Sequence, residues 1–287
     1  MRFGRIGAPG SEIPALWDDG RWFDLRKITD DIDGAFLAAG VDTARTHFRN
    51  GDLREIQPPG GRIGAPIGPP SKIICIGVNY ADHAAESGMA TPEEPVVFMK
   101  DPGTIVGPHD DVLIPPGSTK TDWEVELGVV IGAEARYLAS PDHAADVIVG
   151  YVLSHDVSER EYQLERGGQW DKGKSCDTFN PLGPVLVTHD EVPDPQALGL
   201  RLWVNGSERQ NGSTSQMVFG VNHIVWYLSQ FMVLRPGDLI NTGTPAGVAL
   251  GLPDQPYLRA GDVVELEIEG LGRARNVFID TKFARNA

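Results

Sequence analysis

The sequence predicts a mainly β protein with some helix, an α+β fold, on three observations. Its 287 residues include 34 Gly and 22 Pro, which supply many turns rather than long helices. Hydrophobic residues make up 41% of the chain, enough apolar material for a sizeable core. Short strand-like runs flank turn signals such as Asp18-Asp19-Gly20 and Asn205-Gly206, which are typical of hairpins. These features favour strands over a helical bundle.

Composition divides the chain into three regions. Residues 1–57 alternate strand-like runs with turns, with one short helix over 31–39, and predict a small N-terminal β-rich domain. Residues 58–70 are rich in Pro and Gly, which predicts a linker without regular structure. Residues 71–287 carry every candidate site residue and form the predicted main domain.

Charge and cysteine content limit the function classes. The chain has 25 basic and 40 acidic residues, a net charge of -15, which argues against a nucleic-acid or anionic-membrane surface. An anionic substrate is still compatible, because a bound divalent ion can reverse the local field. No apolar run approaches the ~20 residues that span a bilayer, and the first residues lack the apolar core of a signal peptide. Cys75 and Cys176 are too few for a disulfide framework, so we expect a cytoplasmic protein.

Residues 121–130 predict a strand that carries two glutamates. Alternation places Glu124 and Glu126 on one face, about 7 Å apart along the backbone. A divalent cation between them would offset their repulsion, and carboxylate oxygens suit Mg²⁺, Mn²⁺ or Ca²⁺. On the pattern alone, a solvated outer face is the commoner outcome. The same alternation recurs at Glu265, Glu267 and Glu269, which we expect to be solvated.

Three acid–base candidates lie elsewhere in the chain. Asp156 follows the predicted strand over 148–155 and is either a ligand or the cap of a polar helix over 158–166. His83 and Glu86 share one face of a helix that starts near Ala81, where the carboxylate would orient the imidazole as a general base for water. An exposed polar pair explains the same spacing.

Two further segments could bind a substrate. The polar, irregular stretch 169–179 contains two lysines that would neutralise a carboxylate or polarise a carbonyl, unless it is simply a solvated loop. A strand over 239–241 runs into the small-residue turn 242–245, whose backbone N–H groups can approach an anion closely.

The order of these motifs resembles the fumarylacetoacetate hydrolase family over roughly residues 70–278. The matching motifs are Gly77-Val78-Asn79-Tyr80-Ala81-Asp82-His83 with Glu86, then Glu124 and Glu126, Asp156, Lys174-Ser175-Cys176-Asp177-Thr178, and Thr242-Gly243-Thr244-Pro245. The N-terminal arm and residues 163–172 are similar to one branch of the family, which contains 2,4-diketo-3-deoxy-sugar-acid hydrolases and proteins described as ureidoglycolate lyases.

The resemblance implies a mixed β-sandwich roll, a catalytic domain over 71–287 and a homodimer with one Mg²⁺ or Mn²⁺ per subunit. It implies these roles: metal ligands Glu124, Glu126 and Asp156; a water-activating dyad of His83 and Glu86; Lys174 beside the reacting carbonyl; and Thr244, Gln163 and Arg160 in contact with the substrate. Cys176 and Asn180 depart from residues common in the family and leave the shape of the pocket wall, and hence substrate choice, open.

These parts together predict hydrolysis of the C3–C4 bond of a 2,4-dioxo acid. Water deprotonated by His83 attacks the C4 carbonyl, and the electrons of the broken bond pass into an enolate held by the metal. Three alternatives share the same residues: a 2-hydroxyhepta-2,4-diene-1,7-dioate isomerase, a 2-oxo acid decarboxylase and a ureidoglycolate lyase. A non-catalytic metal-binding protein on the same scaffold is a fourth.

Overall fold

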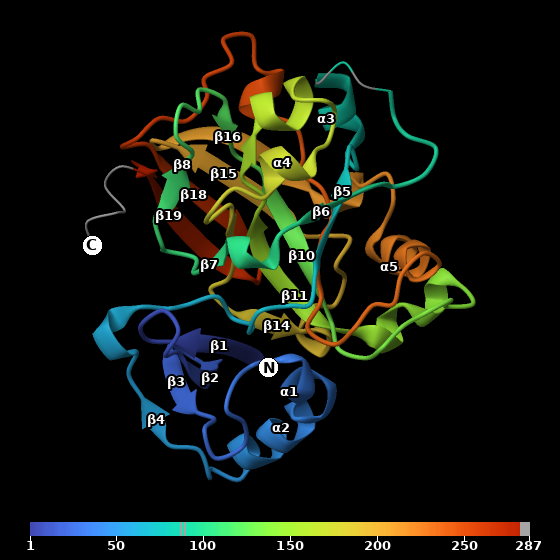
Figure 1. Ribbon diagram of the computed structural model, residues 1–287. Coiled ribbons are helices and arrows are strands. Elements are labelled where there is room, and N and C mark those ends of the chain that lie inside the picture. The colour runs from blue at the N-terminus through green and yellow to red at the C-terminus, as the bar shows by residue number, and fades with distance from the viewer. Residues whose placement is uncertain (87, 89, 282–287) are drawn as a thin grey trace.

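The strands form one large and one smaller sheet in the computed structural model, which describes residues 1–86, 88 and 90–281 (Figure 1). The large sheet has ten strands in the order β4-β3-β2-β1-β14-β11-β10-β17-β5-β6. Their bounds are β1 Arg2–Ile6, β2 Ile13–Asp18, β3 Arg21–Asp24, β4 Glu55–Ile56, β5 Ile73–Gly77, β6 Val96–Lys100, β10 Val125–Ile131, β11 Ile148–His155, β14 Leu186–Thr188 and β17 Leu239–Asn241.

The smaller sheet has five strands in the order β16-β15-β18-β19-β8. Its strands are β8 Val112–Ile114, β15 Gly199–Val204, β16 Ser207–Ser213, β18 Val263–Ile268 and β19 Gly272–Asp280. Two short ladders pair β9 Thr121–Asp122 with β12 Ser158–Glu159, and β7 Ile105–Val106 with β13 Asn180–Pro181. The predicted α+β class, with strands predominating, is confirmed.

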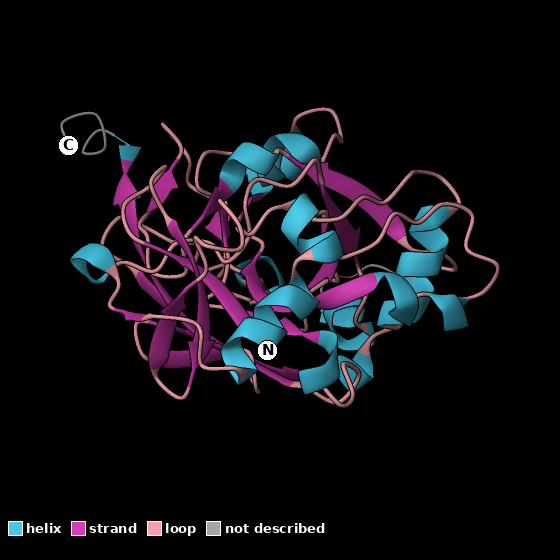
Figure 2. Ribbon diagram, turned by 90° about the horizontal axis from the view of Figure 1, so that it is seen from below, coloured by secondary structure: helices cyan, strands magenta, loops and turns pink. Residues whose placement is uncertain are grey.

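The helices are short and lie around the strands rather than in a layer of their own (Figure 2). Within the described residues they are α1 Gly34–Ala39, α2 Val41–Arg49, α3 Ala81–Glu86, α4 Asp171–Lys174 and α5 Val221–Ser229, with a π-helical turn over Glu161–Glu165. None of the helices in this part of the chain is long and apolar enough to cross a membrane.

The N-terminal residues continue the large sheet, as the blue strands at the bottom of Figure 1 show. β1 pairs antiparallel with β14, which sets Arg2 opposite Val187. The predicted hairpin is present between β2 and β3, with positive φ at Asp19 and Gly20. The sequence did not predict α2, because a glycine cap was expected to end the helical segment at Gly40. Gly40 instead has a right-handed φ of -91°, so the chain passes directly from α1 into α2.

The register of β10 and β11 positions the candidate acids. These neighbouring strands pair antiparallel, with Glu126 opposite Ser154. Asp156 follows the end of β11, and its backbone N–H donates to the carbonyl of Glu124 at 3.0 Å. The predicted continuous strand over 121–130 is wrong in one respect: β9 and β10 are separated at Trp123 and Glu124. The interruption arises because β9 pairs with β12, whereas β10 pairs with β11 and β17.

Two local predictions near the site are corrected. The segment 158–166 is not one polar helix but strand β12 followed by the π-helical turn. The segment 169–179 is not wholly irregular, because it contains α4. Gly173 explains how α4 fits there: a Cβ at this position would lie 2.3 Å from the carbonyl oxygen of Glu159 and 2.5 Å from the amide nitrogen of Gln163. Only glycine allows the two segments this close an approach.

Candidate active site

One cleft brings together most of the predicted site residues. It has a volume of 390 Å³ and lies where β5 and β10 meet α3, α4 and the π-helical turn. Eight of the nine candidates line it: His83, Glu86, Glu124, Glu126, Arg160, Gln163, Lys174 and Thr244. The ninth, Asp156, is fully buried and joins the cleft through its ion pair with Lys174. Segments far apart in the sequence therefore converge on one concave site.

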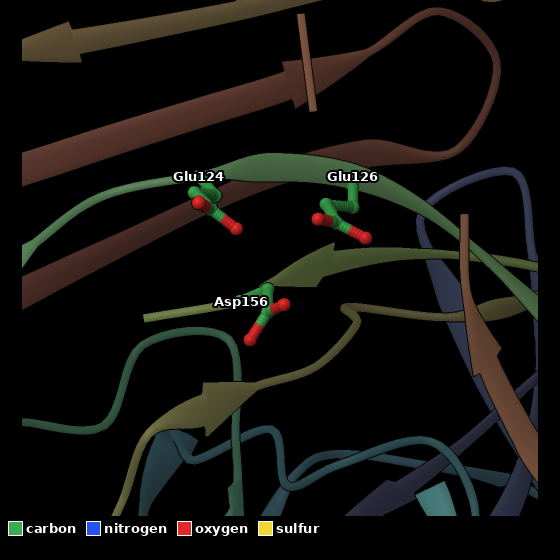
Figure 3. A group of neighbouring side chains, drawn as sticks. All are labelled: Glu124, Glu126 and Asp156. Carbon is green, nitrogen blue, oxygen red and sulfur yellow. The ribbon is translucent and has the colours of Figure 1, made fainter. Parts of the chain in front are cut away.

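The three predicted metal ligands form a tight acidic group. One oxygen from each of Glu124, Glu126 and Asp156 lies within 4.8 Å of the others. Both glutamates extend from the same segment toward the side on which Asp156 lies (Figure 3). Their exposed fractions are 4%, 2% and 0%, so the alternative of a solvated strand face is wrong. Capping by Asp156 is also excluded, because its carboxylate accepts from lysine side chains and Arg160 occupies the cap position of the following turn.

Buried cations pair with most of these acids in an alternating chain. Arg160 donates to Asp122 at 2.8 Å and to Glu124 at 2.7 Å. Lys174 Nζ donates to Glu124 at 2.7 Å and to Asp156 at 2.8 Å. A second lysine, Lys100, bonds the other oxygen of Asp156. Three carboxylates and three cations thus balance one another inside the protein, as buried charges must.

Glu126 lies outside this balance. Its side chain accepts a hydrogen bond from the Gly243 amide at 2.8 Å, and no cation pairs with it among the described residues. Burial and the neighbouring carboxylates of Asp156 and Glu124 raise the pKa of Glu126 well above its ordinary value. The group therefore holds one negative charge more than its cations neutralise whenever Glu126 is ionised.

A divalent cation fits this donor set. The ligands are all hard carboxylate oxygens, which Mg²⁺ and Mn²⁺ prefer, and their spacing suits a single ion. Each oxygen in the ion pairs retains a second lone pair, so the bonds from Lys174 and Arg160 leave coordination capacity. A positive ion would also stabilise the ionised form of Glu126, which is otherwise costly at this depth.

The charge states of the paired residues follow from their partners. Burial opposes ionisation of Glu124, but Lys174 and Arg160 outweigh it and hold the pKa of Glu124 far below its usual range. Burial likewise favours a neutral Lys174, yet Asp156 and Glu124 raise the pKa of Lys174 above its ordinary value. Lys174 therefore remains an ammonium within the cleft.

The predicted dyad lies at the same cleft. His83 is only 6% exposed, and its Nδ1 is buried 3.9 Å from Oε2 of Glu86, with no hydrogen-bond partner in the described part of the chain. This distance exceeds a hydrogen bond, although the two groups face each other on α3 as predicted. Glu86 accepts from the Gly247 amide at 2.8 Å, and this contact and His83 together lower its pKa against the effect of burial. The alternative of an exposed surface pair is wrong for His83.

The three residues predicted to contact the substrate differ in how many of their hydrogen-bonding groups already have partners within the protein. Thr244 donates its hydroxyl to Val125 and accepts from Gln210, so its backbone is the part left for a ligand. Arg160 gives one N–H to Gln163 at 2.9 Å, besides those that bind acids. Gln163 accepts this hydrogen bond through Oε1, which leaves its side-chain amide nitrogen available to a ligand. Substrate binding by these residues stays a prediction.

Several residues of the site were not predicted from sequence. Lys100 ends the apolar strand β6, and Asp122 precedes Glu124; each looks like an ordinary polar residue until its buried ion pair is seen. Phe98 and Trp170 line the cleft with rings 5.3 Å apart. Val78, which also lines the cleft, has a φ of +55°, a strained conformation for a β-branched residue of the kind that clusters at functional sites.

Comparison with known proteins agrees with this geometry. Residues 72–279 match the model of the fumarylacetoacetate (FAA) hydrolase C-terminal domain. The chain belongs to the fumarylacetoacetate hydrolase family. A protein of Burkholderia multivorans that carries a provisional hydrolase name is 53% identical over 276 residues, covering 95% of this chain and 96% of its own.

Solved structures of the family have different activities in their names. The fumarylacetoacetate hydrolase of Exiguobacterium antarcticum matches with a TM-score of 0.84 and 34% identity, over 98% of this chain and 99% of its own. The 2-hydroxyhepta-2,4-diene-1,7-dioate isomerase of Mycobacterium marinum matches with a TM-score of 0.76 and 33% identity over the same shares. The maleylpyruvate hydrolase of Sphingobium sp. SYK-6 was solved with manganese(II) and pyruvate. It matches with a TM-score of 0.80 and 26% identity, over 98% of this chain and 99% of its own. The family therefore includes both hydrolases and isomerases on this fold.

Proposed function

We propose that this protein is a divalent-metal-dependent hydrolase that cleaves the C3–C4 bond of a 2,4-dioxo acid. The observation that carries the proposal is one cleft holding a buried triple-carboxylate group together with an imidazole nitrogen on His83 that has no partner among the residues described. The proposal draws further support from family members named as hydrolases, one of them solved with manganese(II) and pyruvate. These features support a site for a divalent ion, a general base and a small anionic substrate.

The proposed ion is Mg²⁺ or Mn²⁺, held by Glu124, Glu126 and Asp156. When bound, it would act as a Lewis acid toward the carboxylate and keto oxygens of the 2-oxo acid. The protein's own contribution is to fix three oxygens within ligand distance and to hold Glu124 ionised through Lys174 and Arg160.

His83 and Glu86 handle the proton transfer, and Lys174 stabilises the negative charge that develops on the substrate. His83 takes a proton from a water molecule, and Glu86 stabilises the imidazolium that results. The water oxygen adds to C4, where the ammonium of Lys174 stabilises the oxyanion through the N–H that its two carboxylate partners do not use. The C3–C4 bond then breaks and C3 takes up a proton. One water is consumed, and one carboxylic acid and one 2-oxo acid are released.

An isomerase is the second candidate, because one of the closely matching structures carries a 2-hydroxyhepta-2,4-diene-1,7-dioate isomerase name. Isomerisation would use the same acid group and a proton transfer by His83, but it would not add water. The 3.9 Å gap between His83 and Glu86 is compatible with a base that moves as substrate binds.

The deciding experiment follows the water. The Mn²⁺-loaded protein is given an acylpyruvate in ¹⁸O-labelled water, and pyruvate and the released acid are analysed. Hydrolysis predicts one labelled oxygen in the acid and equal amounts of the two products. An unlabelled tautomer of the acylpyruvate as the sole product points to the isomerase, carbon dioxide release indicates a decarboxylase, and no conversion of the acylpyruvate contradicts the proposed hydrolysis.

A further inference from the structure

We infer that the part of the cleft beyond the acidic group takes an uncharged acyl chain, so that the substrate carries one carboxylate rather than two. The inference rests on the proposed function and names its substrate class. It follows from the walls of the cleft, from the pairing of its cations and from the charge balance of the acidic group.

Apolar side chains from separate segments line part of the cleft, beside the polar Gln163 and Gln255. Phe98 on β6 packs edge-on against Trp170, with ring centroids 5.3 Å apart. Trp170 lies so close to Gly77 that a Cβ there would be 2.5 Å from the indole ring. Leu250 and Leu164 line the cleft as well, and Leu164 is 42% exposed. An apolar side chain retained beside an open cleft suits an apolar ligand group.

The cations of the cleft are already committed. In the described part of the chain, the lysines and arginines that line it are Arg160 and Lys174. Each donates to two buried carboxylates at 2.7 to 2.8 Å. A second substrate carboxylate would have to share one of these cations with the buried acids that it already binds. It would also approach the carboxylate of Glu86, which is partly exposed at the same cleft. Both effects disfavour a dianion.

The charge balance leads to the same result. The alternating ion pairs are neutral as a set, and ionised Glu126 adds one negative charge. A divalent ion therefore leaves one positive charge, which the single carboxylate of a 2-oxo acid neutralises. A second substrate carboxylate would add a further negative charge beside Glu86, and the cations of the cleft do not balance it.

The test uses two substrates that differ only at the far end: 2,4-dioxoheptanoate, which ends in a methyl group, and 2,4-dioxoheptanedioate, which ends in a carboxylate. We expect kcat/KM with the Mn²⁺-loaded protein to be higher for the monocarboxylate by at least about tenfold, the effect of about 1.4 kcal/mol. Equal values, or a preference for the dicarboxylate, would overturn the inference.

A pair of variants tests the wall directly. Leu164→Arg adds a cation at an exposed position, where folding tolerates it, and Leu164→Gln is the uncharged control. The arginine is expected to raise the dicarboxylate-to-monocarboxylate ratio of kcat/KM about tenfold over the glutamine variant. An unchanged ratio would contradict the inference that the far end of the substrate lies against Leu164.

Binding separates the inference from the reaction. Calorimetry with the Mn²⁺-loaded protein gives the affinity for each compound whether or not it is cleaved. Preferred binding of the monocarboxylate without cleavage would support the inference and overturn hydrolysis. Equal binding with efficient cleavage of both would support hydrolysis and overturn the inference.

Discussion

Glutamates alternate in the same way around the start of β10, at Glu124 just before it and Glu126 within it, as they do along β18, but the surroundings of the two sets are opposite. All seven residues of β10 are buried, as is the preceding Glu124. In β18, Val264, Leu266 and Ile268 are buried, whereas Glu265 is exposed and Glu267 is half-buried. β10 is covered on its polar side by the segments that supply Lys174, Arg160 and Gly243, while the polar side of β18 faces solvent. Whether the glutamates of a strand are buried or exposed therefore depends on the segments that cover the strand, and not on the alternation of its residues.

The largest expected effect comes from exchanging one glutamate in each strand. Glu126→Gln removes a ligand, and we expect kcat/KM with an acylpyruvate and Mn²⁺ to fall by more than about 100-fold and the Mn²⁺ affinity by at least about tenfold. Glu265→Gln is the matched control on β18, expected within about twofold of wild type. Steady-state kinetics and calorimetry measure both. Equal behaviour of the two variants would refute the distinction between the strands.

Removal of the base is expected to separate catalysis from metal binding. His83→Ala should lower kcat by about 100-fold or more, because a general base contributes at least this factor. The Mn²⁺ affinity should stay within about threefold, since His83 is not among the grouped ligands. His223→Ala is the control: this half-buried ring stacks against Phe219 and lies outside the cleft. Full turnover by His83→Ala would exclude its role.

The raised pKa of Glu126 predicts that the stability of the protein depends on pH. Between the ordinary carboxyl value of 4.5 and the raised pKa of Glu126, the folded metal-free protein binds one more proton than the unfolded chain. Its stability therefore falls as pH rises through this range.

Metal binding removes that proton, so the affinity for Mn²⁺ should rise with pH, by up to about tenfold per pH unit, until Glu126 is ionised in the free protein. Thermal unfolding with chelator and with Mn²⁺, from about pH 5 to about pH 8, should show a growing difference in Tm. In Glu126→Gln this growth should disappear. A constant difference in the wild type would argue against proton release from Glu126.

The smallest effect is expected on β18. Glu267 pairs with Arg273 at 2.6 Å, but the arginine is largely exposed, and surface pairs of this kind contribute little. Glu267→Gln should change the free energy of unfolding by about 0.5 kcal/mol or less, as measured by urea denaturation. A much larger loss would mean that the polar face of β18 is not simply solvated.

Part of the site was predictable because it depends on local pattern. Strand β11, which Asp156 follows, was predicted from an apolar run, and the spacing of His83 and Glu86 follows from the helical repeat. The ion pairs were not predictable in this way. Lys100 and Asp156 are 56 residues apart in the chain, and no local pattern links them.

The sequence by itself determined the α+β class, the hairpins at Asp19-Gly20 and Asn205-Gly206, and the order of the site motifs. These depend on turn chemistry and on the alternation of side chains along a strand, which are local properties. Only the tertiary structure decided that Glu124 and Glu126 are buried beside Asp156 and that, among the residues the structure describes, no cation pairs with Glu126. That outcome depends on which segments the fold brings over each strand, and hence on contacts distant in sequence.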